Sequence, residues 1–325
     1  MNATTLLRPM TIGDMFDAAF RLYREHFLTF IGIGALLQVP MAIIQFTVQF
    51  VLGGAAMQDV LRFSARPPGG QNPFAAFPFA SFATFYLITL GLGAFQYLIV
   101  RNLATGALAN AISRSYHGEP TSILGAYSFG VRRYVALILA SLVPLVASLL
   151  VAGLIVGCSI GVLATLGVRP GERPNIGLII VAVLGLMFLV LLIVVASIFV
   201  YTRLLLTPQA IVLEDHAAWA GIRRSWRLVE GSFWRTLAIM LLMGILIYLI
   251  SALPAGILSF SLTLANRGSP SGLIFSQAIS ALVAEIGVII ALPLQLAVYT
   301  LLYYDLRVRK EGYDIEIMAQ QAGQS

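Results

Sequence analysis

The sequence predicts an all-α integral membrane protein with six transmembrane helices, arranged as three parallel hairpin repeats. Hydrophobic residues make up 59% of the 325 residues and charged residues only 10%, whereas a soluble globular domain carries about 25% charged residues. Six apolar runs reach the roughly 20 residues that are needed to cross about 30 Å of hydrocarbon. A pattern of four residues also recurs at the start of the first, third and fifth runs.

The six apolar runs give the predicted spans in chain order. The third and fifth are longer than a bilayer requires, so we expect them to tilt, to bend at Pro144 or Pro254, or to extend past the membrane. Asp14, Asp17 and Glu25 precede the first run, which is itself long, and this predicts a retained span instead of a cleavable signal peptide. The runs cover residues 27–53, 79–100, 134–168, 176–202, 236–265 and about 282–304.

Each hairpin is preceded by the recurring pattern, whose spacing of i, i+4, i+7 and i+11 places four side chains on one face of a helix. This predicts a cytoplasmic interfacial amphipathic helix before each hairpin, with Phe20, Tyr127 and Trp226 in equivalent places. The repeat units are about 8–101, 102–205 and 206–310 of a single membrane domain, with a tail at 311–325. The copies are Phe16, Phe20, Tyr23 and Phe27; Ile123, Tyr127, Gly130 and Tyr134; and Ile222, Trp226, Val229 and Phe233.

Basic residues predict the orientation. If successive segments are assigned alternately to two sides, fifteen of the 20 Lys and Arg residues fall on one side. By the positive-inside rule both termini face the cytoplasm of a bacterial inner membrane. The same balance makes the three repeats parallel and related by an axis along the membrane normal. The five residues on the other side are Arg62, Arg66, Arg169, Arg173 and Arg267.

The segment at about 217–234 is a candidate lipid-binding or interfacial element. It holds all three tryptophans of the chain, interleaved with arginines. Indole rings suit the headgroup zone, and guanidinium groups pair with anionic phosphates. The segment either anchors the protein in the membrane or recognises lipids or a partner. Its candidate residues are Trp219, Arg223, Arg224, Trp226, Arg227 and Trp234.

Polar residues inside the spans form a candidate polar path. Gln38, Gln45 and Gln49 recur along one stripe of the first span, and Glu285 is the acidic residue expected within the sixth. Glu285 acts in a proton or cation relay, pairs with a polar side chain, or lies near the outer interface because the span starts after it. The glutamines line a polar path or bond across helices and hold the bundle together.

Chemistry-bearing motifs are scarce, and the sequence predicts no catalytic, cofactor-binding or metal-binding residues. His26, His117 and His216 lack a second ligand at metal spacing, and neither a nucleophile motif nor a glycine-rich phosphate loop is present. Cys158 lies within a span and is expected to pack there. Gly153, Gly157 and Gly161 form small-xxx-small steps, a packing signal within the chain or between two copies.

Three stretches together resemble a bacterial family, the glycerophosphoryl diester phosphodiesterase membrane-domain proteins. They are 8–27 (RPMTIGDMFDAAFRLYREHF), 213–237 (LEDHAAWAGIRRSWRLVEGSFWRTL) and 301–319 (LLYYDLRVRKEGYDIEIMA). The resemblance covers nearly the whole chain, and the pattern at 303–312 is its most specific part. It implies a membrane domain only, because the phosphodiesterase barrel that some members carry, with its metal-binding Glu and His residues, has no counterpart here.

We therefore expect a non-enzymatic membrane protein that organises or binds lipids or proteins at the cytoplasmic face, including as an accessory subunit of a membrane complex. Its expected partners are membrane lipids with anionic headgroups and a protein partner or second copy, and not nucleic acid. The alternative is a transporter or channel with a polar path between the repeats.

Overall fold

The computed structural model describes residues 9–64, 78–165, 176–266 and 269–312, and over these ranges the regular structure is entirely helical. Six of the described helical segments are long and apolar enough to cross a membrane, which confirms the predicted number of spans and indicates a multi-pass membrane protein. They are Phe27–Ser64, Phe79–Tyr116, Ile123–Ser159, Ile180–Leu213, Phe233–Ala265 and Ser271–Glu311.

The spans are built from straight and interrupted helices. The first is α2 (Phe27–Ser64), the third is α6 (Ile123–Thr165), the fourth is α7 (Ile176–Leu204) and the sixth is α12 (Pro270–Glu311). The second comprises α4 (Phe79–Phe95), the π-helical turn η2 (Gln96–Val100) and α5 (Arg101–Tyr116). The fifth comprises α10 (Phe233–Ile247), the π-helical turn η3 (Tyr248–Ala252) and α11 (Leu253–Ala265).

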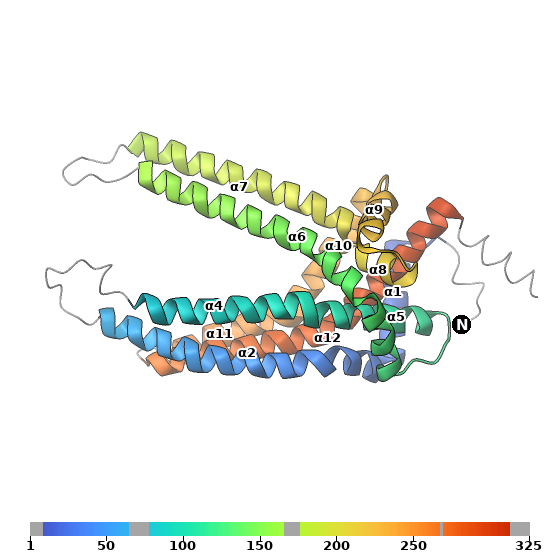
Figure 1. Ribbon diagram of the computed structural model, residues 1–325, viewed down its shortest axis with the longest axis horizontal. Coiled ribbons are helices and arrows are strands. Elements are labelled where there is room, and N and C mark those ends of the chain that lie inside the picture. The colour runs from blue at the N-terminus through green and yellow to red at the C-terminus, as the bar shows by residue number, and fades with distance from the viewer. Residues whose placement is uncertain (1–8, 65–77, 166–175, 267–268, 313–325) are drawn as a thin grey trace, which may run out of the picture.

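Three shorter helices, α1 (Ile12–Glu25), α8 (Thr207–Leu213) and α9 (Ala218–Val229), gather at one end of the molecule, together with the second half of α5 and the last turns of α12 (Figure 1). We call this the α9 end. The helix α1 starts there at a capping box, in which the Thr11 hydroxyl accepts from the Asp14 amide and the Asp14 carboxylate accepts from the Thr11 amide, both at 3.1 Å. These two bonds satisfy backbone donors that a helix start otherwise leaves free.

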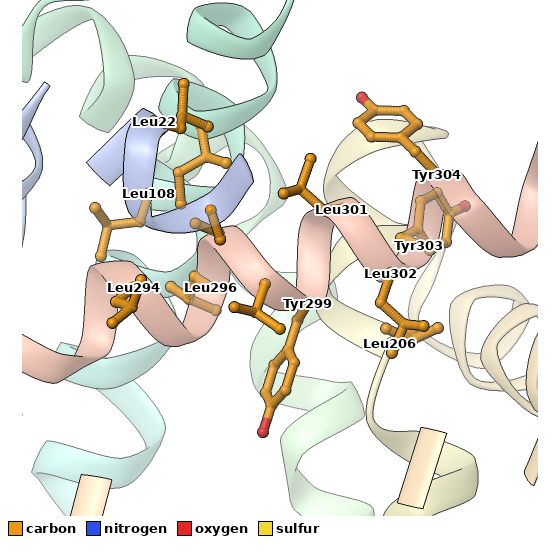
Figure 2. Packing of buried hydrophobic residues seen from close by; sticks show 14 of the residues in the cluster. Leu22, Leu108, Leu206, Leu294, Leu296, Tyr299, Leu301, Leu302, Tyr303 and Tyr304 are labelled. Carbon is orange, nitrogen blue, oxygen red and sulfur yellow. The ribbon is translucent and has the colours of Figure 1, made fainter. Parts of the chain in front are cut away.

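The helix α12 forms the centre of the main hydrophobic core. Its residues from Leu292 to Leu306 are buried except Gln295, and their apolar members pack against α1, α2, α5, α10 and the segment before α8. Figure 2 shows this packing, with Leu22 of α1 and Leu108 of α5 close to the α12 side chains. The fourth span is the opposite case, because none of its most apolar stretch is buried. The sixth span is therefore a protein-surrounded helix, and the fourth faces outward.

The three hairpins do not have equal surroundings. α2, α4, α11 and α12 lie together, whereas the α6–α7 hairpin leans away from them toward the end opposite α9 (Figure 1). α12 packs along both α2 and α11, but α6 and α7 touch the rest of the protein mainly through α5, α8, α9 and α10. This differs from the symmetrical bundle of hairpins that the repeat pattern suggests.

The second repeat also differs from the expected pattern at its start. Residues 123–134 are not a separate interfacial helix but the first turns of the continuous helix α6. Gly130, which interrupts the apolar pattern, lies where α6 crosses α5: a Cβ at this position would come within 3.0 Å of the Ala107 backbone nitrogen. The glycine thus permits a close helix crossing. Nearby, the Tyr127 hydroxyl donates to the Ile33 carbonyl of α2 at 2.6 Å.

Candidate functional site

The helix α9 presents a tryptophan and arginine surface at the α9 end. Gly221, Ser225, Leu228 and Val229 are buried against the protein, and at Gly221 a Cβ would stand only 2.5 Å from the Ile211 side chain of α8. One side of α9 is therefore held tightly against its neighbours. The residues at the other side, spaced i, i+4, i+7 and i+8, are the exposed Trp219, Arg223, Trp226 and Arg227.

The aromatic rings of this surface are among the most exposed large apolar side chains of the chain. Trp219 is 63% exposed and Trp234, at the start of α10, is 78% exposed. Trp226 is more enclosed, because Arg203 of α7 lies 5.2 Å from its ring centroid and 5.3 Å from that of Phe199. Trp219 and the Arg223 and Arg227 guanidinium groups are thus exposed on the outer side of α9, and Trp234 is exposed at the start of α10. We call these residues, together with Trp226, the Trp/Arg surface: Trp219, Arg223, Trp226, Arg227 and Trp234.

Arg224 does not belong with the exposed residues among which the sequence predicts it, because its side chain points into the protein and is only 15% exposed. Its Nε and Nη2 donate to the two carboxylate oxygens of Glu214, both at 2.7 Å. Its Nη1 and Nη2 also donate to the carboxylate of Glu311 at the end of α12. This double bidentate arrangement uses the guanidinium charge internally, so Arg224 joins α9 to α8 and α12 and is not free for a lipid.

Glu214 is the centre of this ion cluster. Arg307 approaches its carboxylate at 3.1 Å and His216 at 3.0 Å. Burial raises the pKa of Glu214, but the hydrogen bonds and charges of Arg224 and Arg307 outweigh burial and hold that pKa below its ordinary value of 4.5. The hydrogen bonds with Glu311 and then with Glu214 raise the pKa of Arg224 in spite of its burial, so Glu214 and Arg224 both stay charged at neutral pH.

A second ion cluster fastens the start of the described chain to α10 and α12. The Asp305 carboxylate, whose side chain is fully buried, accepts from the Met10 amide at 2.8 Å and from Arg309 Nε at 2.9 Å, and it lies 3.0 Å from Arg235. The Met10 carbonyl accepts from both arginines, each at 2.7 Å. We call these four residues the Asp305 clasp.

The two clusters explain the pattern at 303–312 (YYDLRVRKEG) on which the resemblance depends. Asp305 and Arg309 belong to the clasp, and Arg307 and Glu311 belong to the Glu214 cluster. Gly312 ends α12 in a left-handed conformation (φ 64°) that favours glycine. All three stretches that carry the resemblance thus contribute to the α9 end, and the motif residues within the described ranges join helices there.

The predicted polar path becomes a hydrogen-bonded cluster around Gln96, which the sequence reasoning missed. Gln96 Nε2 donates to Glu285 Oε1 at 3.0 Å and to Gln38 Oε1 at 3.3 Å, and Gln45 Nε2 donates to Gln96 Oε1. Gln49 is not part of these bonds. Glu285 lies 15 residues into α12, about 23 Å from its start, so it lies well inside the helix and not in its first turns.

Cavities accompany this cluster. One of about 320 Å³ is lined by Gln38, Gln96 and Arg101, among others, and a second of about 300 Å³ lies beneath the α6–α7 hairpin. Arg101, Tyr97, Leu292 and Gln295 line both. The interior near Gln96 is therefore neither sealed nor purely apolar.

In the described ranges no group of three His, Cys, Asp or Glu residues has the geometry to hold a metal ion. The histidines have local roles: His117 Nδ1 lies 2.7 Å from the Ser113 carbonyl, and His216 lies beside Glu214. The predicted positions Arg66, Arg169, Arg173 and Arg267 and the tail beyond residue 312 lie outside the described residues.

Comparison with known proteins gives a family but no named relative. No curated protein and no solved structure matches the chain. Residues 74–306 match a family described as a domain of unknown function (DUF7847), and this region contains the second to fifth spans, α9 and most of α12, which is the sixth span. The chain therefore belongs to the DUF7847 family.

Proposed function

We propose that this protein is a non-enzymatic membrane protein that binds anionic lipid headgroups through the Trp/Arg surface, with the α9 end facing the cytoplasm. The observation that carries the proposal is the exposure of Trp219, Arg223 and Arg227 on one side of α9, whose other side is buried, together with the exposed Trp234 at the start of α10. Such a surface combines rings that prefer the headgroup zone with cations that pair with phosphate.

The charge distribution at the α9 end supports this proposal. Arg21 and Arg24 of α1 and Arg132 of α6 are also exposed there, so the end carries several free cations around α9. A surface of this kind attracts an anionic leaflet over about 8 to 10 Å at physiological salt. The predicted orientation, with both termini inside, places it at the inner leaflet, which is where positive residues are enriched.

The test is the double variant Arg223→Gln/Arg227→Gln, purified in mild detergent with its bound lipids. Each arginine near a charged leaflet contributes about 1 kcal/mol, so losing both lowers affinity for phosphatidylglycerol or cardiolipin about 30-fold at low salt. The matched control is Arg62→Gln, which lies 76% exposed on α2 at the other end. Equal retention of anionic lipid by the double variant and the control contradicts the proposal.

The double variant also separates lipid binding from the predicted role as an accessory subunit. Loss of a co-purifying protein with unchanged lipid content indicates that the Trp/Arg surface contacts a protein partner. The link to the glycerophosphoryl diester phosphodiesterase membrane-domain family stays a prediction from the three sequence stretches, and it adds no activity to the proposal.

A second candidate function is transport, and the Gln96 cluster is the observation that favours it. Glu285 and three amides meet in the middle of the bundle beside a cavity, and carboxylates at such depth often serve ion or proton movement. We favour lipid binding because the amides bond one another, as they do in packed bundles. Proton or cation flux into proteoliposomes that is abolished by Glu285→Gln supports transport instead.

A further inference from the structure

The cavity beneath the α6–α7 hairpin has a cation, Arg101, in its wall. Arg101 starts α5 directly after the π-helical turn η2, is exposed, and forms no hydrogen bond or ion pair with any described residue. Glu285 lies within electrostatic range of Arg101, but no nitrogen and oxygen of the two approach within 4.0 Å among the described contacts. An unpaired guanidinium among membrane spans is costly, so a counter-charge is expected.

A second part of the wall offers hydrogen bonds that the described residues do not use. Gln209 of α8 is fully buried, and neither its amide nitrogen nor its amide oxygen is hydrogen-bonded within the described chain. The Thr207 hydroxyl, which also lines the cavity, is buried and has no hydrogen-bond partner in the described chain. Asn102, by contrast, is satisfied by Ser141 at 2.9 Å and by the Leu98 carbonyl. Buried polar groups normally have partners, so Gln209 and Thr207 point to a polar ligand.

The rest of the cavity wall is largely apolar. Leu137 and Pro144 of α6, Met240 and Gly244 of α10 and Leu292 of α12 line it. Toward the opposite end of the molecule α6 leans away from α12 (Figure 1), and the long apolar side chains of α6 and α7 there are exposed. The polar wall therefore lies near the α9 end, and the apolar wall continues into surface that contacts acyl chains.

We infer that this cavity binds one anionic amphiphile, whose phosphate headgroup pairs with Arg101 and accepts from the Gln209 amide while its acyl chains lie along α6 and α10. A volume of about 300 Å³ lies at the lower limit for small-molecule sites and accommodates a headgroup, whereas the chains extend outside. Tyr97, Tyr201 and Tyr299 also line the cavity, and tyrosine is enriched at the depth where lipid headgroups meet the hydrocarbon. This site shares no residue with the Trp/Arg surface, so the two proposals can be tested independently.

Native mass spectrometry of the full chain in detergent tests the inference with three probes: phosphatidylglycerol, phosphatidylcholine and soluble glycerol phosphate. The parent is expected to retain one phosphatidylglycerol in preference to phosphatidylcholine. Arg101→Gln is expected to weaken this binding about tenfold or more, as for the loss of a charge-assisted hydrogen bond. Arg62→Gln is the matched control, since Arg62 is 76% exposed on α2 at the other end of the molecule and does not line the cavity.

Two further variants distinguish a loss of lipid binding from misfolding of the protein. Gly244→Leu places a side chain at the cavity where a Cβ meets nothing within 4 Å, so the helix is undisturbed while the apolar entrance is filled, and binding is expected to fall. Gln209→Leu removes an unsatisfied amide, so thermal stability without lipid is retained or increased while lipid affinity falls. A purely structural role of Gln209 leaves affinity unchanged.

Three results overturn the inference: unchanged phosphatidylglycerol binding in Arg101→Gln, unchanged binding in Gly244→Leu, or glycerol phosphate competing as well as the intact lipid. The last result assigns the site to a soluble phosphate compound instead of an amphiphile.

Discussion

Asp305→Asn is the substitution that tests the architecture of the α9 end most sharply. The change keeps the size of the side chain but removes the charge that two arginines face. Asp305 is fully buried, Arg235 is 22% exposed and Arg309 is 36% exposed. Removing one partner of a buried ion pair costs about 3 to 5 kcal/mol. Because Arg309 is partly solvated, the low limit of about 3 kcal/mol applies here.

The loss of stability should appear first in α1, because the Asp305 clasp holds the Met10 backbone just before this helix. Hydrogen exchange of the α1 amides in detergent measures the opening directly, and about 3 kcal/mol corresponds to a rate increase of about 150-fold. Asp17→Asn is the control, because Asp17 is exposed on the same helix, and its effect is expected within about twofold. Exchange in Asp305→Asn that stays within the range of this control refutes the clasp.

Two further predictions concern the ion cluster and the helix crossing. The pKa of Glu214 is lowered on folding, so the stabilisation that it provides is present at neutral pH and is lost as pH falls below the ordinary value of 4.5. Tryptophan emission, which reports only on 219–234, should shift in that range. Glu214→Gln should make this shift smaller, and the Glu311 carboxylate, whose pKa is also lowered, accounts for the rest. Gly130→Ala forces a Cβ to 3.0 Å from the Ala107 nitrogen and should lower the free energy of unfolding by about 1 to 3 kcal/mol. A lower melting temperature measures this loss. Gly153→Ala, where a Cβ meets nothing within 4 Å, is the control and should leave the melting temperature unchanged.

The number of spans could be predicted from the sequence because hydropathy over about 20 residues reports on the bilayer itself. The interior arrangement could not be predicted in the same way. The most apolar stretches of α2 and α12 have nearly the same mean hydropathy, 2.1 and 2.2, yet 28% of the first and 50% of the second are buried. Side chains that contact lipid and side chains that contact other helices are similarly apolar, so hydropathy does not distinguish an outward-facing helix from a buried one.

The candidate site was predicted in part. The Trp/Arg segment was identified from composition, but the inward direction of Arg224 depends on Glu214 and Glu311, which are distant in sequence and meet it only in the fold. Gln96 was missed because a single amide in an apolar run gives little signal; its position after α4, where the helix changes to a π-helical turn, is what directs it toward Gln38 and Glu285. Gly130 was noted as an exception, and the close α5–α6 crossing is its physical reason.

Quenching of intrinsic tryptophan fluorescence by brominated lipids tests the central claim most directly, since all three tryptophans lie in 219–234. In proteoliposomes at low salt, brominated phosphatidylglycerol is expected to quench more strongly than brominated phosphatidylcholine at the same mole fraction. The difference should shrink in high salt and disappear in Arg223→Gln/Arg227→Gln, because it comes from screened charge. Equal quenching by the two lipids at every salt concentration contradicts the claim that the Trp/Arg surface recognises anionic headgroups.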